Sequence, residues 1–179
     1  SYGTDIDRRA ADIDSSTGYA KASQSCYQSE FTKLISARKA KTINDTEGRK
    51  RLAEIVAGLK ESNDLITAVN GKTGEDINNY TQAYEKDLQT VGVQRTDVAT
   101  VVAADTTPAT TTTSKKKAPV KKKLPTVPQE AVSTEKTLQA AKTKQAAGQQ
   151  VAATGQSQVN AMCKNPDLGD WAPVPCPNV

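Results

Sequence analysis

The sequence contains no histidine among its 179 residues, and this absence excludes several kinds of site. Serine or cysteine nucleophiles that are activated by an imidazole need that side chain, and so do the zinc sites that use imidazole nitrogen. The commonest general base of enzymes is missing as well. We therefore expect no enzymatic activity and no catalytic residues, and we find no pattern that predicts a metal site or a cofactor.

Two short motifs resemble ligand-binding loops but lack the residues that such loops need. The GKTG at 71–74 ends like a phosphate-binding loop, yet Ile66 stands where the first glycine belongs. The DIDSSTG at 12–18 begins like a calcium loop, but Thr17 replaces the glycine of the sharp turn and Ser23 replaces the bidentate glutamate. Neither motif therefore predicts a binding site.

Large apolar side chains are also scarce. Leu, Ile, Val and Phe together supply 30 residues, and the aromatic residues are five Tyr, one Phe and one Trp. This share lies below the roughly 20% under which a chain struggles to offset the entropy cost of becoming ordered. We expect an elongated, mostly helical protein that hides part of its apolar surface against partner subunits or its own copies.

The net positive charge of +4 comes entirely from one short segment, TTTTSKKKAPVKKKLPTVP at 110–128. Its six lysines are Lys115, Lys116, Lys117, Lys121, Lys122 and Lys123. The other 18 basic residues nearly balance the 20 acidic ones. We predict that these lysines contact a partner. It could be nucleic acid, whose phosphates lysines neutralise, although the aromatic residues that would add base stacking are absent. It could also be an acidic surface of a partner subunit, an anionic lipid or a cell-wall polymer. The remaining interpretation is a solvated spacer.

Helical periodicity is clearest between residues 45 and 104. The predicted packing residues, which mostly follow the i, i+3, i+4, i+7 rule, are Leu52, Ile55, Val56, Leu59, Ile66, Val69, Ile77, Tyr80, Tyr84, Leu88 and Val91. Asn70-Gly71 is typical of a helix C-terminus, and Thr73-x-x-Asp76 approximates a capping box. We therefore predict two helices, at 45–70 and 74–104, that form an antiparallel hairpin.

A first helix at about 5–41 is indicated by one apolar residue in every seven. The repeating residues are Ile6, Ile13, Ala20, Tyr27 and Leu34. The positions three residues after them are mostly polar, so the predicted apolar stripe is only one residue wide. Residues 1–104 would then form one helical region.

The second half of the chain changes composition twice. Four prolines within 105–128 exclude a continuous helix there and favour an extended arm. Residues 129–162 are rich in Ala and Gln and predict a helix that packs closely against a neighbour. Residues 163–179 predict an irregular tail. The predicted fold class is all-α, with hairpin or coiled-coil-like helices, an extended Thr/Lys/Pro-rich arm and an irregular C-terminal loop.

Cys163 and Cys176 bracket the tail segment KNPDLGDWAPVP. We predict a disulfide between them, which would stabilise the loop by roughly 3 kcal/mol and would imply an oxidising compartment. The alternative is two free thiols in a cytosolic protein. If the disulfide forms, Cys26 is left over as a small residue at a helix contact, or else as an intermolecular link. Trp171 is the only large aromatic group in the loop, and we predict that it inserts into a partner.

These features together favour a non-enzymatic structural or assembly subunit of a multi-subunit complex. We expect a homo- or hetero-oligomeric assembly of the virion, phage or cell-envelope type, in an extracytoplasmic or virion location and without a transmembrane segment. The alternative is a genome-packaged protein that binds phosphates through Lys115–Lys123. A third hypothesis is an exported accessory protein or inhibitor that uses the Trp171 loop.

Overall fold

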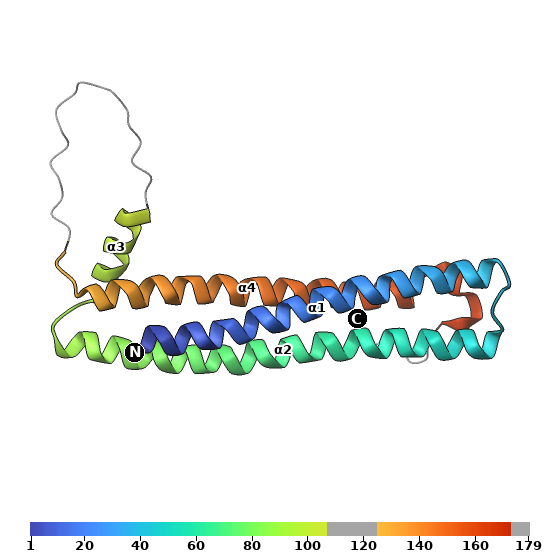
Figure 1. Cartoon of the computed structure of the whole chain (residues 1–179), viewed down its shortest axis with the longest axis horizontal. Helices are drawn as coiled ribbons and strands as arrows, with labels where there is room; N and C mark the ends of the chain where they lie inside the picture. The colour runs from blue at the N-terminus through green and yellow to red at the C-terminus, as the bar shows by residue number, and fades with distance from the viewer. Residues whose placement is uncertain (107–124, 173–179) are drawn as a thin grey trace, which may run out of the picture. The chain divides into compact units, whose positions relative to one another are not determined.

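The computed structural model describes residues 1–106 and 125–172. The elements are the helices α1 (Tyr2–Lys39), α2 (Asp45–Thr90), α3 (Arg95–Thr106) and α4 (Gln129–Cys163), and the short 3-10 helix η1 (Pro166–Trp171) (Figure 1). These described residues contain no strand, so the predicted all-α class is confirmed. None of the helices within them has the length and hydrophobicity that a membrane span requires.

The chain folds as two compact units, which are described separately. Unit 1 comprises the described residues of Ser1–Arg9 and Glu75–Thr143, and unit 2 comprises those of Ala10–Gly74 and Lys144–Val179. Helices α1, α2 and α4 supply residues to both units. Segments that lie far apart in the sequence therefore form each core.

Unit 2 contains three long helical segments that lie side by side (Figure 1). The Asp14 carboxylate lies 3.0 Å from the Lys144 ammonium, and the Gln24 side-chain amide donates to the Val151 carbonyl at 2.8 Å. From the first contact to the second, the residue numbers increase along both helices, so α1 and α4 run parallel. Helix α2 runs antiparallel to them, because the chain reverses direction in the short loop between α1 and Asp45.

The buried stripe of α1 is two residues wide, and the predicted single stripe is too narrow. The missing partners lie four residues after the repeating residues rather than three, at Ala10, Thr17, Gln24 and Phe31, and each is at most 9% exposed. Spacings that alternate between four and three keep one face of a helix directed at its neighbours. Because two of these partners are polar, the stripe was not visible as an apolar pattern.

The predicted break between residues 70 and 74 is absent, and α2 continues through it, so the predicted antiparallel hairpin of helices 45–70 and 74–104 is wrong. Asn70 and Thr73 are at most 6% exposed, like Ile66 and Ile77 on either side of them. The Asn70 side-chain amide donates to the Gln145 carbonyl of α4 at 3.0 Å, which uses the polar group that made this site resemble a turn. Tertiary contact thus overrides a local preference for a helix end.

Most of the predicted packing residues of α2 are buried. They are Leu52, Ile55, Val56, Leu59, Ile66, Ile77, Tyr84 and Leu88. Val69 and Tyr80 are half-buried. Val91 is 64% exposed and is not a packing residue, because the helix has already ended at Thr90.

Helix α2 ends in a glycine turn rather than at Asn70-Gly71. Gly92 has φ +70°, its amide donates to the Gln89 carbonyl at 3.1 Å, and the Val93 amide donates to the Leu88 carbonyl at 3.0 Å. This pair of bonds satisfies the last carbonyls of the helix in the Schellman arrangement. Lys41, with φ 55°, terminates α1 in the same way, although a left-handed conformation is costly for a residue with a Cβ.

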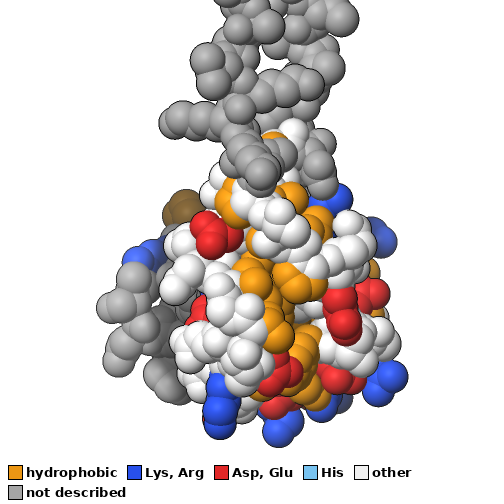
Figure 2. All heavy atoms as spheres, turned by 90° about the vertical axis from the view of Figure 1, so that its left-hand side faces the viewer, with side chains coloured by type: hydrophobic (Ala, Val, Ile, Leu, Met, Phe, Trp, Pro, Cys, Tyr) orange, Lys and Arg blue, Asp and Glu red, His pale blue; other side chains and the backbone are white. Residues whose placement is uncertain are grey.

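The core of unit 1 is small and is bordered by charge. Its buried cluster consists of Tyr84, Leu88, Val98 and Ala131, and the partly buried residues packed against it are Tyr2, Val93 and Val127. Figure 2 shows hydrophobic side chains gathered in a strip with acidic side chains beside it. The Arg95 guanidinium lies 2.7 Å from the Glu85 carboxylate and 3.1 Å from that of Glu135.

The environment of Tyr84 in unit 1 predicts that the free energy of unfolding falls at alkaline pH. The Tyr84 hydroxyl donates to the Ala131 carbonyl at 3.1 Å, and burial of the phenol together with the nearby Glu135 carboxylate raises the pKa of Tyr84 to about 12 from 10.0. A raised pKa means that the folded state binds this proton more tightly. The stabilisation is therefore complete below pH 10 and is lost as the pH rises through about 12.

We expect Tyr84→Phe to flatten the fall of the unfolding free energy between pH 10 and pH 12. At neutral pH it should cost about 1 kcal/mol, because the hydrogen bond to Ala131 is lost. Urea unfolding followed by circular dichroism at several pH values measures both effects. An alkaline slope that is the same in Tyr84→Phe and in the parent chain would contradict this account.

Candidate functional site

Some of the site residues predicted from the sequence lie outside the residues that the structure describes. Lys115, Lys116, Lys117, Lys121, Lys122, Lys123 and Cys176 all belong to this group. Cys163 is 7% exposed and belongs to the core of unit 2, and Cys26 is exposed on α1. Among the described residues, no group of three or more acidic or cysteine side chains is arranged to hold a metal ion.

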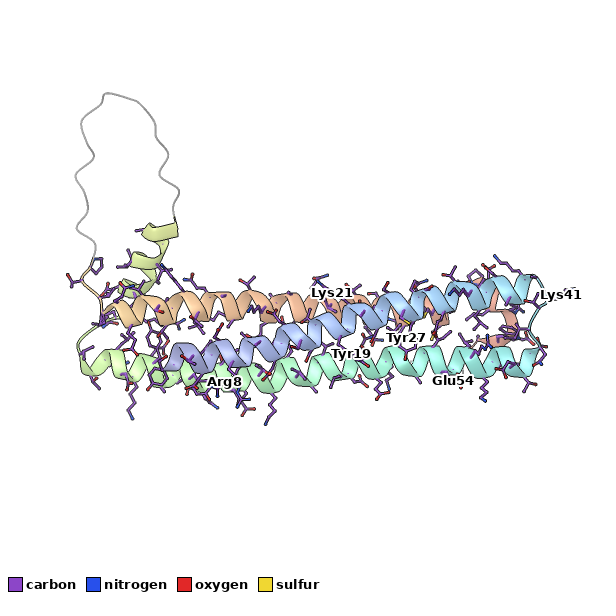
Figure 3. All side chains as sticks on the ribbon, viewed as in Figure 1. Arg8, Tyr19, Lys21, Tyr27, Lys41 and Glu54 are labelled. Carbon is purple, nitrogen blue, oxygen red and sulfur yellow. The ribbon has the colours of Figure 1, made fainter. Side chains whose placement is uncertain are left out.

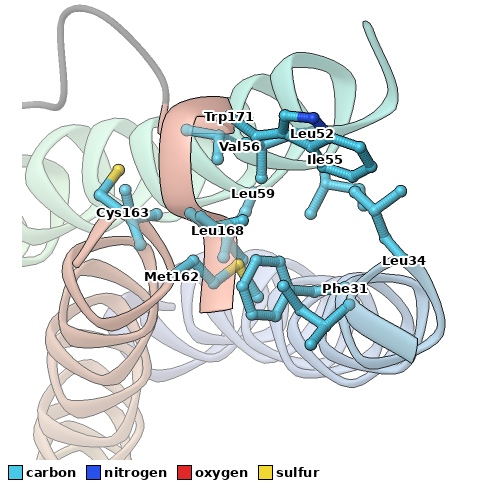
Figure 4. Packing of buried hydrophobic residues seen from close by; sticks show 12 residues of the cluster. Phe31, Leu34, Leu52, Ile55, Val56, Leu59, Met162, Cys163, Leu168 and Trp171 are labelled. Atoms are coloured by element: carbon cyan, nitrogen blue, oxygen red, sulfur yellow. The ribbon is translucent and has the colours of Figure 1, made fainter. Parts of the chain in front are cut away.

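Trp171, which we predicted to insert into a partner, is instead buried within unit 2. Its side chain is 2% exposed and packs in a cluster with Leu52, Leu59 and Met162, among others (Figure 4). The reason is that η1 folds back across the ends of α1 and α2, where Gly48 leaves room for the ring. The tryptophan fills the chain's own core, and we withdraw it as a partner-binding residue.

Polar contacts hold this tail segment in place. The Trp171 indole N–H donates to the Asp45 carboxylate at 2.9 Å, and the Arg38 guanidinium lies 5.2 Å from the centre of the tryptophan ring. Arg38 also donates to the Asp167 carbonyl at 2.9 Å, and Arg49 pairs with Asp170 at 2.9 Å. Residues 164–172 are therefore part of unit 2.

The best candidate for a functional site is an open groove between α1 and α2 in unit 2. Its volume is about 610 Å³. It is lined by Tyr27, Glu30, Lys33, Leu34 and Ala37 of α1 and by Arg51, Glu54 and Ile55 of α2. Leu34 and Ile55 are each 4% exposed and form an apolar floor. A concave site with an apolar floor is the usual form of a binding site in proteins.

The rim of this groove carries both signs of charge. Glu30 and Lys33 stand on α1, and Arg51 and Glu54 stand on α2. The Arg51 guanidinium lies 3.4 Å from the Glu47 carboxylate one turn earlier, and both side chains are largely exposed. The rim therefore has no net charge and favours a ligand that is neither strongly acidic nor strongly basic.

Tyr27 closes one end of the groove. A methyl group at Gly58 would overlap the Tyr27 phenol, so the glycine lets this ring lie across α2. Burial raises the pKa of Tyr27, and the nearby Glu30 carboxylate raises it further. The phenol is therefore a neutral hydrogen-bonding group at the end of an apolar floor.

Two large apolar side chains are exposed beyond Tyr27 on the same pair of helices. Tyr19 of α1 is 59% exposed, and Leu65 of α2 is 47% exposed. Their chain neighbours Ala20 and Ile66 meet in one buried cluster, so Tyr19 and Leu65 lie at the same level of unit 2. Figure 3 shows Tyr19 and Tyr27 along the edge of α1 that borders α2, with Lys21 on the opposite edge. We call Tyr19 and Leu65 the apolar knob.

Sequence reasoning missed both the groove and the knob. The spacing of Tyr27 and Leu34 indicated a buried stripe. The spacing did not indicate that these residues would line a groove together with Ala37. The one available signal was Gly58 within an otherwise regular helix, because such a glycine indicates close approach of another group. Comparisons with protein-family models, curated proteins and solved structures find no match.

Proposed function

We propose that this chain is a non-enzymatic structural subunit that enters a larger assembly by docking a partner into the α1/α2 groove of unit 2. The single observation that carries the proposal is the groove itself. It has a buried floor of Leu34 and Ile55, a charged rim, and no described side chain that fills it. The virion or cell-envelope setting is part of the same proposal and rests on the composition of the chain.

The shape of the groove suits a helix or a large side chain from another subunit. Apolar floors with polar rims are typical of protein interfaces, in which the centre excludes water and the edge remains wet. The exposed knob extends this surface by two further apolar groups. The alternative of nucleic acid binding rests on lysines outside the described residues, and no described contact favours it.

The test is lysine-directed cross-linking followed by mass spectrometry on native material, without prior isolation of the chain. Lys33 stands on the rim of the groove, and Lys21 lies on the opposite edge of the same helix (Figure 3). We expect Lys33, but not its matched control Lys21, to link to another subunit. If Lys33 forms only links that a single copy of the chain can span within itself, while other lysines react normally, the proposed docking site is wrong.

A further inference from the structure

We propose that the partner in the groove is a second copy of this chain, whose apolar knob enters the groove across a two-fold axis. This inference rests on the proposed function and names the occupant of the same site. In a two-fold interface the same patch serves both subunits, so the patch must carry both the projection and the hollow that receives it. The α1/α2 face of unit 2 carries both.

The register of the two helices sets the distance between knob and groove. Tyr27 packs on Gly58, and Ala20 meets Ile66, so one level of α1 corresponds to one level of α2 throughout this face. The groove extends along α1 from Tyr27 to Ala37, and the two levels compared are those of Tyr19 in the knob and Leu34 in the groove floor. Fifteen residues of helix separate them by about 22 Å.

A two-fold axis halfway between these levels brings each knob onto the opposite groove. The halfway level is that of residues 26 and 27, where Cys26 is exposed. With the axis perpendicular to the helices there, Tyr19 of each copy reaches the level of Leu34 in the other. The two copies of Cys26 then face each other near the axis.

The chemistry of the groove suits a tyrosine ring. Leu34 and Ile55 offer an apolar floor, while Lys33 and Arg51 stand at the rim on opposite sides. Cations within about 6 Å of an aromatic face are attracted to its electrons. A partner of another kind would have to supply a matching ring independently, whereas a second copy already carries Tyr19 at the required spacing.

The size of the face places this interface in the class of weak, transient contacts. From Tyr19 to Ala37 the strip is about 27 Å long and two helices wide, which corresponds to roughly 500–600 Å² for each partner. Stable interfaces commonly bury about 800 Å² on each side, so this one is at the small end. We therefore expect a dissociation constant in the micromolar range.

The experiment uses the full chain in sedimentation equilibrium, together with a short bis-maleimide cross-linker. We expect a monomer–dimer equilibrium and a covalent dimer that Cys26→Ser abolishes. Tyr19→Lys removes the ring and puts a charged ammonium over the apolar floor of the other copy, and it should weaken the dimer by about 30-fold or more. Val91→Lys changes an equally exposed valine in unit 1, and this control should leave the dimer unchanged.

A compensating change separates a contact between copies from an effect on folding. Arg51→Glu in the Tyr19→Lys background opposes the new lysine with a carboxylate of the other copy, and it should restore much of the lost affinity. A chain that stays monomeric up to about 100 µM, or a dimer that Tyr19→Lys leaves unaffected, would overturn self-pairing. If such a monomer still links through Lys33 to a different subunit in native material, self-pairing is overturned and the proposed function stands.

Discussion

Trp171→Ala is expected to lower the free energy of unfolding by about 3–5 kcal/mol, the usual cost of truncating a buried aromatic side chain. The ring is 2% exposed and fills the space above Gly48, so its removal leaves a cavity among Leu52, Leu59 and Met162. The hydrogen bond to Asp45 and the contact with Arg38 are lost as well. Urea unfolding followed by far-ultraviolet circular dichroism measures the change.

The control for this prediction is Trp171→Phe, which keeps a ring and loses only the indole N–H and part of the volume. It should cost clearly less than Trp171→Ala. Because Trp171 is the only tryptophan of the chain, its fluorescence in the parent protein reports the same burial directly. If Trp171→Ala unfolds at the same urea concentration as the parent protein, the tail segment is not part of the core.

Gly155→Ala is expected to destabilise unit 2 by about 1–3 kcal/mol, although the same change at an ordinary helix position stabilises. A methyl group at residue 155 would overlap the side-chain oxygen of Asn63 and lie 2.6 Å from the Gln24 amide nitrogen. Gln24 is held by its bond to the Val151 carbonyl, and Asn63 is 4% exposed. The neighbouring side chains therefore have little room to move.

Two further variants isolate this effect. Gly18→Ala changes a helical glycine of α1 whose added methyl group would meet nothing within 4 Å, and it should stabilise the protein by up to about 1 kcal/mol. Asn63→Ala combined with Gly155→Ala should cost less than the sum of the two single changes, because the overlapping oxygen is gone. A strictly additive double variant would show that residues 63 and 155 do not meet.

The main helices were predictable because they depend on periodicity. Leu52, Ile55 and Leu59 recur at helical spacing, and the structure buries all three. The Ala- and Gln-rich segment at 129–162 likewise forms α4 almost at its predicted limits. These signals are local, so a single sequence contains them.

The errors have a common cause, which is that this core contains polar side chains. Asn70 followed by glycine is typical of a helix end in isolation, yet here the asparagine amide bonds to Gln145 of a distant helix. Thr17 and Gln24 are likewise polar residues that are buried, so the second half of the α1 stripe could not be recognised from an apolar pattern. Whether such a residue ends a helix or lies inside it depends on contacts between segments more than 70 residues apart.

The candidate site depended even more on the tertiary structure. The sequence around Trp171 indicated an exposed side chain in a proline-containing tail. In the structure the ring occupies the space above Gly48 and contacts Arg38 and Asp45, so it is buried. The groove exists only where α1 and α2 lie against each other. Tyr19 could be recognised as an exposed knob only once the register of these two helices was known.

Hydrogen exchange, compared between the native assembly and the isolated chain at low concentration, tests the docking surface most directly. The account predicts slower exchange in the assembly for residues 27–37 and 51–55, which line the groove, and unchanged exchange for residues 146–157 of α4. Protection confined to α4, with the groove exchanging equally fast in both samples, would contradict it.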